Sequence, residues 1–182
     1  KTSLASLACE SLAMTQIKPI WSTTTGHVTG IALIFVATGM GIGTFVEFLD
    51  GDSGEAMLLS TAITALFGYL LWKGTSTGAL DHITLFSAVG VTWLTVSVVG
   101  ALPYLLAGTF ERPGIGFSVV FADALFESIS GYTASGSTVF GLHNPIVDQG
   151  AGLLLYRQLT QWIGGVGIVV LVVTVLPSVR AA

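Results

Sequence analysis

Residues 128–138 read SISGYTASGST, and this stretch is the most informative feature of the chain. It is uncharged, rich in small side chains and interrupted by two glycines, Gly131 and Gly136. The apolar segment before it, residues 119–130, is too short to cross a bilayer, whereas residues 152–176 after it are long enough. An irregular loop at membrane depth is tolerated where it lines a water-filled path, and its backbone carbonyls can then bind a desolvated cation. The stretch therefore predicts a re-entrant loop in an ion pathway.

The composition of the whole chain is that of an integral membrane protein. Of its 182 residues, 52% are hydrophobic and 9% are charged, whereas a soluble domain has about 25% charged residues. The mean hydropathy of +0.85 agrees. The 23 glycines suit close packing of helices in lipid. A net charge of −4 argues against nucleic-acid binding, and the single cysteine, Cys9, excludes an internal disulfide.

Apolar runs predict four membrane spans and one half-length helix. The spans are expected at residues 27–49, 56–72, 83–106 and 152–176, with the half-length helix at 119–130. Pro177 is expected to close the last span, and Pro103 lies near the far end of the third. The expected divisions are a cytoplasmic segment at 1–26 with an interfacial helix at 3–20, a transmembrane hairpin at 27–82 and a repeat at 83–182.

Charge placement predicts the orientation in the membrane. The first side of the predicted topology holds Lys1, Lys18, Lys73 and Arg180 against Glu10 and Asp81. The other side holds Arg112 and Arg157 against Glu47, Asp50, Asp52, Glu55, Glu111, Asp123, Glu127 and Asp148. The basic side is expected to be cytoplasmic. The acidic side would raise the cation concentration at a pore mouth, although mere solvation of the acidic loop is the alternative.

Residues 133–137 have the properties of an ion filter. They carry no bulky or charged side chain, and glycine permits the dihedral angles that turn carbonyls toward an axis. The helix before them points its C-terminal end, with its partial negative charge, at the loop. Glu127 lies one turn before the loop, where an unpaired carboxylate is unfavourable. Glu127 therefore anchors the loop amides, contacts the cation or reaches the surface.

Arg157 and the glycines of the last span each permit two interpretations. Arg157, at the outer end of the last span, either pairs with Asp148 or an acid of the half-length helix, or extends to the interface. The glycines of the same span indicate close packing or a kink; they are Gly164, Gly165 and Gly167. The histidines lack metal-ligand spacing; they are His27, His82 and His143.

Three motifs resemble a known family. Residues 126–138, FESISGYTASGST, resemble the first pore loop of the Trk/Ktr/HKT superfamily of potassium transporters. Residues 156–168, YRQLTQWIGGVGI, look like the helix that follows that loop, and residues 99–104, VGALPY, resemble the end of the family's outer helix. The motifs occur in the family's order and spacing. The resemblance covers residues 83–177, and the two preceding spans fit the additional N-terminal hairpin of the Trk branch.

The resemblance implies an all-α integral membrane protein with a potassium-channel-like fold, in which four outer helix–pore helix–inner helix repeats surround a pore. This chain would supply the N-terminal hairpin and the first repeat. By position, the filter carbonyls would come from Thr133, Ala134, Ser135 and Gly136, with Glu127 and Arg157 supporting the filter. In the plant branch a serine at the position of Gly136 is associated with Na⁺, so glycine favours K⁺ here.

The resemblance further implies K⁺ uptake and no enzymatic activity, no cofactor in this chain, and a bacterial or archaeal plasma membrane. Its expected partners are a second copy of the protein, in a homodimer, and a cytosolic nucleotide-binding regulatory subunit. Channel-like transport and symport with H⁺ or Na⁺ both stay open. Because the chain contains one pore loop, either it is the N-terminal part of a longer transporter or four chains assemble.

Three other functions are alternatives. One is a Na⁺ or mixed Na⁺/K⁺ transporter of the same fold, and another is a non-transporting membrane scaffold. The third is an intramembrane serine protease that uses Ser135 and His143. It is disfavoured because Thr133 replaces the glycine expected before the serine, and because His143 lies in a polar loop.

Overall fold

The computed structural model describes residues 23–78, 82–141 and 144–180. Its elements are α2 (Thr23–Asp50), α3 (Glu55–Gly74), α4 (His82–Val99), α5 (Leu102–Leu106), α6 (Phe117–Tyr132), the 3₁₀ turn η1 (Ile146–Asp148) and α7 (Ala151–Arg180). Within these ranges the regular structure is helical, apart from one isolated bridge between Gly141 and Asn144. The predicted all-α class is therefore confirmed. The expected interfacial helix at 3–20 lies outside the described residues.

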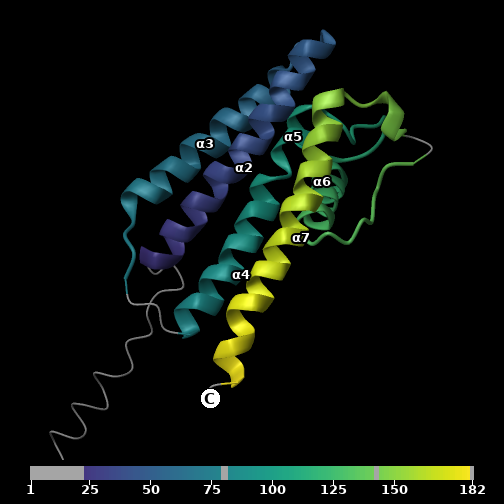
Figure 1. Cartoon of the computed structure of the whole chain (residues 1–182). Coiled ribbons are helices and arrows are strands. Elements are labelled where there is room, and N and C mark those ends of the chain that lie inside the picture. Colours follow the sequence, from purple (N-terminus) through teal and green to yellow (C-terminus); the bar gives the residue numbers. More distant parts are fainter. Residues whose placement is uncertain (1–22, 79–81, 142–143, 181–182) are drawn as a thin grey trace, which may run out of the picture.

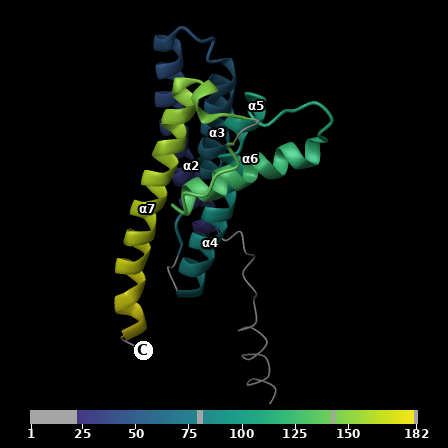
Figure 2. The ribbon, with the colours of Figure 1, turned by 90° about the vertical axis from the view of Figure 1, so that its right-hand side faces the viewer.

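Long helices form the body of the molecule. α2, α3, α4 and α7 are rods, and α2 packs against the other three (Figure 1). Within the described part of the chain, three segments are each long and apolar enough to cross a membrane: Thr24–Asp50, Glu55–Gly74 and Thr84–Leu106. The loop between α2 and α3 lies near the start of α7, and the end of α7 lies at the opposite end of the bundle (Figure 2). The order of the elements follows the hydropathy of the sequence.

The third span, expected at 83–106, is present as Thr84–Leu106, and a turn at Gly100 and Ala101 divides it into α4 and α5. α4 ends before Gly100, and α5 begins at Leu102 with Pro103 in its first turn, where a missing backbone N–H is tolerated. Gly100 makes room for α6, since a Cβ there would stand 2.5 Å from the ring of Tyr132. The sequence does not reveal this turn because the apolar run continues through it.

α6 is too short to cross the membrane. Its 16 residues correspond to roughly 24 Å of helix, below the hydrocarbon thickness of about 30 Å. Figure 2 shows α6 lying across the long helices rather than alongside them. It packs against α4, α5 and α7. The predicted half-length helix at 119–130 is thus two residues longer at each end, and its C-terminus points into the bundle.

The end of the last helix differs from the prediction. Pro177 is expected to close the span, but α7 continues to Arg180. A proline removes one backbone donor, and a long membrane helix can continue through that gap. The helix also begins at Ala151, one residue before the predicted start.

Three tyrosines join the elements around α6. Tyr104, Tyr132 and Tyr156 are buried, with exposed fractions of 0%, 2% and 1%. The hydroxyls of Tyr132 and Tyr156 lie 3.1 Å apart, and the Tyr156 hydroxyl donates to the carbonyl of Gly100 at 2.9 Å. The rings of Tyr104 and Tyr156 pack with their centroids 6.0 Å apart. α5, α6 and α7 therefore share one aromatic core.

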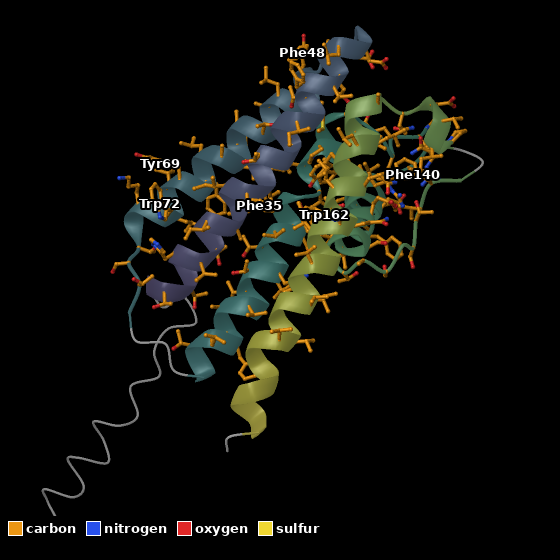
Figure 3. The ribbon with its side chains drawn as sticks, in the orientation of Figure 1. Phe35, Phe48, Tyr69, Trp72, Phe140 and Trp162 are labelled. Atoms are coloured by element: carbon orange, nitrogen blue, oxygen red, sulfur yellow. The ribbon has the colours of Figure 1, made fainter. Side chains whose placement is uncertain are left out.

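Large apolar side chains cover the outside of the bundle. Phe35 is 57% exposed, Phe48 51% and Trp162 66%, and Figure 3 shows side chains of this kind along the long helices. Tyr69 and Trp72 form an aromatic pair near the end of α3, with ring centroids 6.1 Å apart. An apolar exterior of this extent is the surface expected of helices in contact with lipid.

Candidate functional site

The loop that follows α6 has an unusual backbone. The dihedral φ is negative at Thr133 and Ser135 but positive at Ala134 (53°) and Gly136 (73°). An alternation between right- and left-handed residues turns successive peptide planes in the same sense, which puts N–H groups on one side and carbonyl oxygens on the other. Glycine adopts the left-handed region freely, whereas alanine does so at a cost of about 1–2 kcal/mol. The conformation is therefore held by contacts around the loop.

The amides of this loop point back to α6. The N–H of Thr133 donates to the carbonyl of Ile129 at 2.9 Å, and that of Ala134 donates to Gly131 at 2.9 Å. The N–H of Ser135 donates to the carbonyl of Ser130 at 3.1 Å. These bonds extend the hydrogen bonding of α6 by three residues, so the helix holds the N–H side of the loop.

Four successive carbonyls of the loop accept no hydrogen bond among the described residues, whereas the carbonyl before them and the carbonyl after them do; we call these four the free row. The carbonyl of Tyr132, just before the row, accepts a hydrogen bond from the indole Nε1 of Trp93 at 3.0 Å. The carbonyl of Ser137, just after it, accepts from the hydroxyl of Ser130 at 2.5 Å. Among the described residues, no hydrogen bond reaches the carbonyls of the residues between them, Thr133, Ala134, Ser135 and Gly136. These four residues are also exposed.

Glu127 lies behind the loop and is 1% exposed. Its carboxylate accepts hydrogen bonds from the hydroxyl of Thr138 at 3.0 Å and from the N–H of Val139 at 3.0 Å, both through Oε2. Of the three interpretations of Glu127, exposure at the surface is inconsistent with this burial. The carboxylate therefore binds Thr138 and Val139, which follow the free carbonyl row in the chain.

Arg157 of α7 neutralises this carboxylate. Its Nε donates to Oε1 of Glu127 at 2.5 Å, and its side chain is 9% exposed. The guanidinium also lies over the ring of Phe140, 5.9 Å from the centroid. The structure thus pairs Arg157 with an acid of the half-length helix and places it inside the protein, not at the interface. One buried ion pair joins α6, the returning loop and α7.

Two further contacts hold α6 in place, and the sequence predicts a partner for neither of them. The hydroxyl of Ser128 donates to the carbonyl of Ser97 at 2.7 Å, which joins α6 to α4. Gly131 lies against Thr160, since a Cβ at position 131 would clash with the threonine hydroxyl. A small polar residue within an apolar helix is the available signal for Ser128, but its partner depends on how the helices are rotated.

Charged residues farther from the loop also pair. Arg112 and Asp123 form an ion pair at 2.9 Å near the start of α6, with side chains 33% and 19% exposed. Glu47 of α2 accepts a hydrogen bond from the N–H of Leu153 at 3.2 Å. That amide is in the first turn of α7, where helical N–H groups lack an intrahelical partner and carry partial positive charge. Glu47 therefore fastens the N-terminal hairpin to α7.

The protease and metal interpretations gain nothing from the geometry. The hydroxyl of Ser135 lies 3.0 Å from that of Ser130, and His143 lies outside the described residues. Within the described ranges, no group of three or more His, Cys, Asp or Glu side chains is placed to hold a metal ion.

Comparisons with known proteins agree with one another. Residues 53–181 match the family model TrkH, described as a cation transport protein. The chain is 33% identical over 154 residues to the Trk system potassium uptake protein TrkH of Escherichia coli K12, covering 83% of this chain and 30% of that protein. It is 30% identical over 156 residues to the Trk system potassium uptake protein TrkI of Halomonas elongata, covering 84% of this chain and 30% of the relative.

A solved structure shows the same fold. The crystal structure of the potassium transporter TrkH from Vibrio parahaemolyticus superimposes with a TM-score of 0.71 at 30% sequence identity. The match covers 85% of this chain and 32% of that one. The chain thus spans about a third of the length of the proteins that it matches.

Proposed function

Because the chain belongs to the TrkH family of cation transport proteins, we propose that it contributes the first pore repeat of a membrane protein that takes up K⁺. The family consists of transporters and not of enzymes, in agreement with the sequence-based expectation. The finer assignment, a filter built from the carbonyls of Thr133, Ala134, Ser135 and Gly136, is our proposal.

One observation carries the filter assignment. The free carbonyl row begins after Tyr132, whose carbonyl is bonded to Trp93, and ends before Ser137, whose carbonyl is bonded to Ser130. The alternating sign of φ within the row favours carbonyls on one side. A desolvated cation needs oxygen ligands in place of its hydration shell, and a row of carbonyls with no other partner can supply them.

The surroundings of the row favour a cation over an anion. α6 directs its C-terminal end, with about half an elementary negative charge, toward the loop. No basic side chain lies in the loop, and the buried guanidinium of Arg157 is neutralised by Glu127. In our proposal Glu127 and Arg157 support the filter from behind and do not touch the ion, because the carboxylate is occupied by Thr138, Val139 and Arg157.

The row is one part of a complete site. The exposure of residues 133–138 supports the idea that other loops face them across a pore, and the relatives are long enough to contain such loops. We propose that the remaining loops belong to the same, longer polypeptide. We carry over as proposals a homodimer, a cytosolic nucleotide-binding regulatory subunit, a cytoplasmic N-terminus and a bacterial or archaeal plasma membrane. Symport and channel-like transport are both compatible with this site.

The test is an uptake assay on the intact transporter in a bacterial strain that lacks its own K⁺ uptake. Gly136→Ser places a side chain on a left-handed residue of the row, whereas Gly141→Ser changes a glycine without positive φ and with open space around it. We expect Gly136→Ser to reduce the preference for K⁺ over Na⁺, and Gly141→Ser to behave as the wild type.

The alternatives give different results in the same assay. Uptake of Na⁺ in preference to K⁺ by the wild type would identify a Na⁺ transporter of the same fold. No ion uptake by the intact, folded protein would favour a scaffold. Unchanged uptake and selectivity in Gly136→Ser would contradict the proposed filter.

A further inference from the structure

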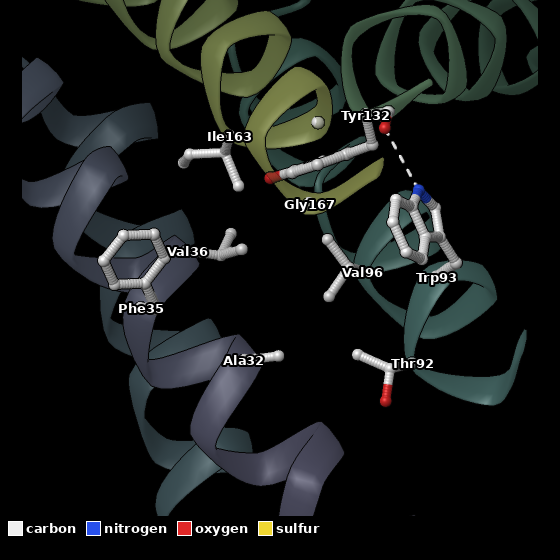
Figure 4. A pocket seen from close by; sticks show the side chains of 10 residues that line it. Ala32, Phe35, Val36, Thr92, Trp93, Val96, Tyr132, Ile163 and Gly167 are labelled. Carbon is white, nitrogen blue, oxygen red and sulfur yellow. Dashed lines mark hydrogen bonds between the residues drawn. The ribbon is translucent and has the colours of Figure 1, made fainter. Parts of the chain in front are cut away.

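Trp93 of α4 contacts the point where the free carbonyl row begins. Its indole Nε1 donates to the carbonyl of Tyr132, the last residue of α6, at 3.0 Å (Figure 4). The next carbonyl along the chain is that of Thr133, the first of the free row. The carbonyl of Tyr132 is therefore already hydrogen-bonded to the indole, and the free row starts at Thr133.

Two glycines of α7 create the space for this bond. A Cβ at Gly164 would clash with the carbonyl oxygen of Tyr132, and a Cβ at Gly167 would stand 3.2 Å from the far edge of the Trp93 ring. The two glycines are about one helical turn apart, so they face the same neighbours. A side chain at position 164 would exclude the carbonyl, and a side chain at position 167 would crowd the indole.

A partly open apolar pocket of about 140 Å³ lies beside the bonded pair (Figure 4). Val36, Val96 and Ile163 are among the side chains that line it, together with Trp93 and Tyr132. Its apolar walls offer a water molecule few polar partners. Without Trp93 the carbonyl of Tyr132 would therefore lose its protein donor, and the pocket offers few replacements.

From this geometry we infer that Trp93 is a positioning residue for the ion filter, which fixes where the carbonyl row starts and so contributes to ion selectivity. The inference rests on the proposed function. When the indole N–H is removed, the peptide between Tyr132 and Thr133 is held only by the bond from the Thr133 N–H to the carbonyl of Ile129. Its carbonyl oxygen has lost its donor and can tilt toward the row. In some molecules the row then begins at the carbonyl of Tyr132 and in others at that of Thr133. The spacing of the oxygens therefore favours one ion less strongly.

The experiment uses the intact transporter in reconstituted vesicles and measures rubidium influx in competition with Na⁺. Trp93→Phe keeps an aromatic ring and removes the donor. A second variant carries benzothienylalanine at position 93, which keeps the indole shape with sulfur in place of the N–H. We expect both to lower the preference for Rb⁺ over Na⁺ by about fivefold, the effect of one net hydrogen bond. Trp162→Phe, at a 66% exposed position, is the matched control and should not change the preference.

The outcomes separate this inference from the proposed function. If the benzothienylalanine variant folds and keeps wild-type selectivity while Gly136→Ser loses it, the filter stands and the role of Trp93 is wrong. If neither the benzothienylalanine variant nor Gly136→Ser changes selectivity, the proposed filter itself is wrong. Thermal stability measured on the same preparations excludes general unfolding as the cause, since a purely structural role would lower stability without changing the ion preference of the folded fraction.

Discussion

Breaking the ion pair between Glu127 and Arg157 should destabilise the transporter more than removing the whole pair. Both side chains are buried, and Nε of Arg157 lies 2.5 Å from Oε1 of Glu127. Glu127→Gln leaves the guanidinium without a counter-charge, and Arg157→Met leaves the carboxylate without one. Leaving one member of a buried pair uncompensated costs about 3–5 kcal/mol.

The double variant removes both charges together. Its glutamine side chain at position 127 still accepts one hydrogen bond from the Thr138 hydroxyl or the Val139 N–H, so the remaining loss is about 1–2 kcal/mol, the worth of one or two hydrogen bonds. The double variant should therefore be more stable than either single variant, with a coupling energy above about 2 kcal/mol.

The assay is reversible unfolding of the intact transporter in lipid–detergent mixtures, with growth on limiting K⁺ as the functional readout. The matched control is the same cycle on Arg112 and Asp123, a more exposed pair, for which the coupling should stay below about 1 kcal/mol. Additive effects of Glu127→Gln and Arg157→Met would refute the reasoning, because two coupled charges cannot act independently.

The remaining predictions concern backbone fit and helix capping, and all are measured in the same unfolding assay. Gly164→Ala should lower the free energy of unfolding by about 1–3 kcal/mol, because the added Cβ meets the Tyr132 carbonyl. Gly90→Ala, with nothing within 4 Å of the added Cβ, should leave the stability unchanged or raise it slightly. Equal effects of the two substitutions would contradict the packing described. Ala134→Gly should stabilise the fold by about 0.5–1 kcal/mol by relieving a left-handed alanine, and a loss of stability would contradict the assigned backbone. Glu47→Ala should lower the free energy of unfolding by about 1 kcal/mol, because the N–H of Leu153 loses its hydrogen-bond acceptor. Glu47→Gln keeps an acceptor oxygen and should lower it less. A larger loss in the glutamine variant would require another role for the carboxylate.

The coarse fold could be predicted from the sequence because it depends on the length and polarity of apolar runs. The helix boundaries could not, since they depend on local packing: Gly100 ends α4 where the aromatic ring of Tyr132 needs space. Pro177 is a weaker stop signal than the sequence suggests, because a long helix can continue past a single missing donor.

The candidate site was predictable in its location but not in its construction. Small uncharged residues marked the loop, and the depth of Glu127 required a partner. The choice of Glu127 over Asp148 as the partner of Arg157 depends on how α6 and α7 are rotated against each other, and one sequence does not contain that information. The bond from Trp93 to Tyr132 is hidden for the same reason, and the left-handed Ala134 is contrary to the preference of alanine.

The most direct measurement is a structure of the intact transporter in Rb⁺, with the ion located by its anomalous scattering. We expect an ion within coordination distance of carbonyl oxygens from Thr133 to Gly136, with the carbonyl of Tyr132 still bonded to Trp93. An ion bound elsewhere along the pore, with these carbonyls turned away from it, would contradict the proposed filter.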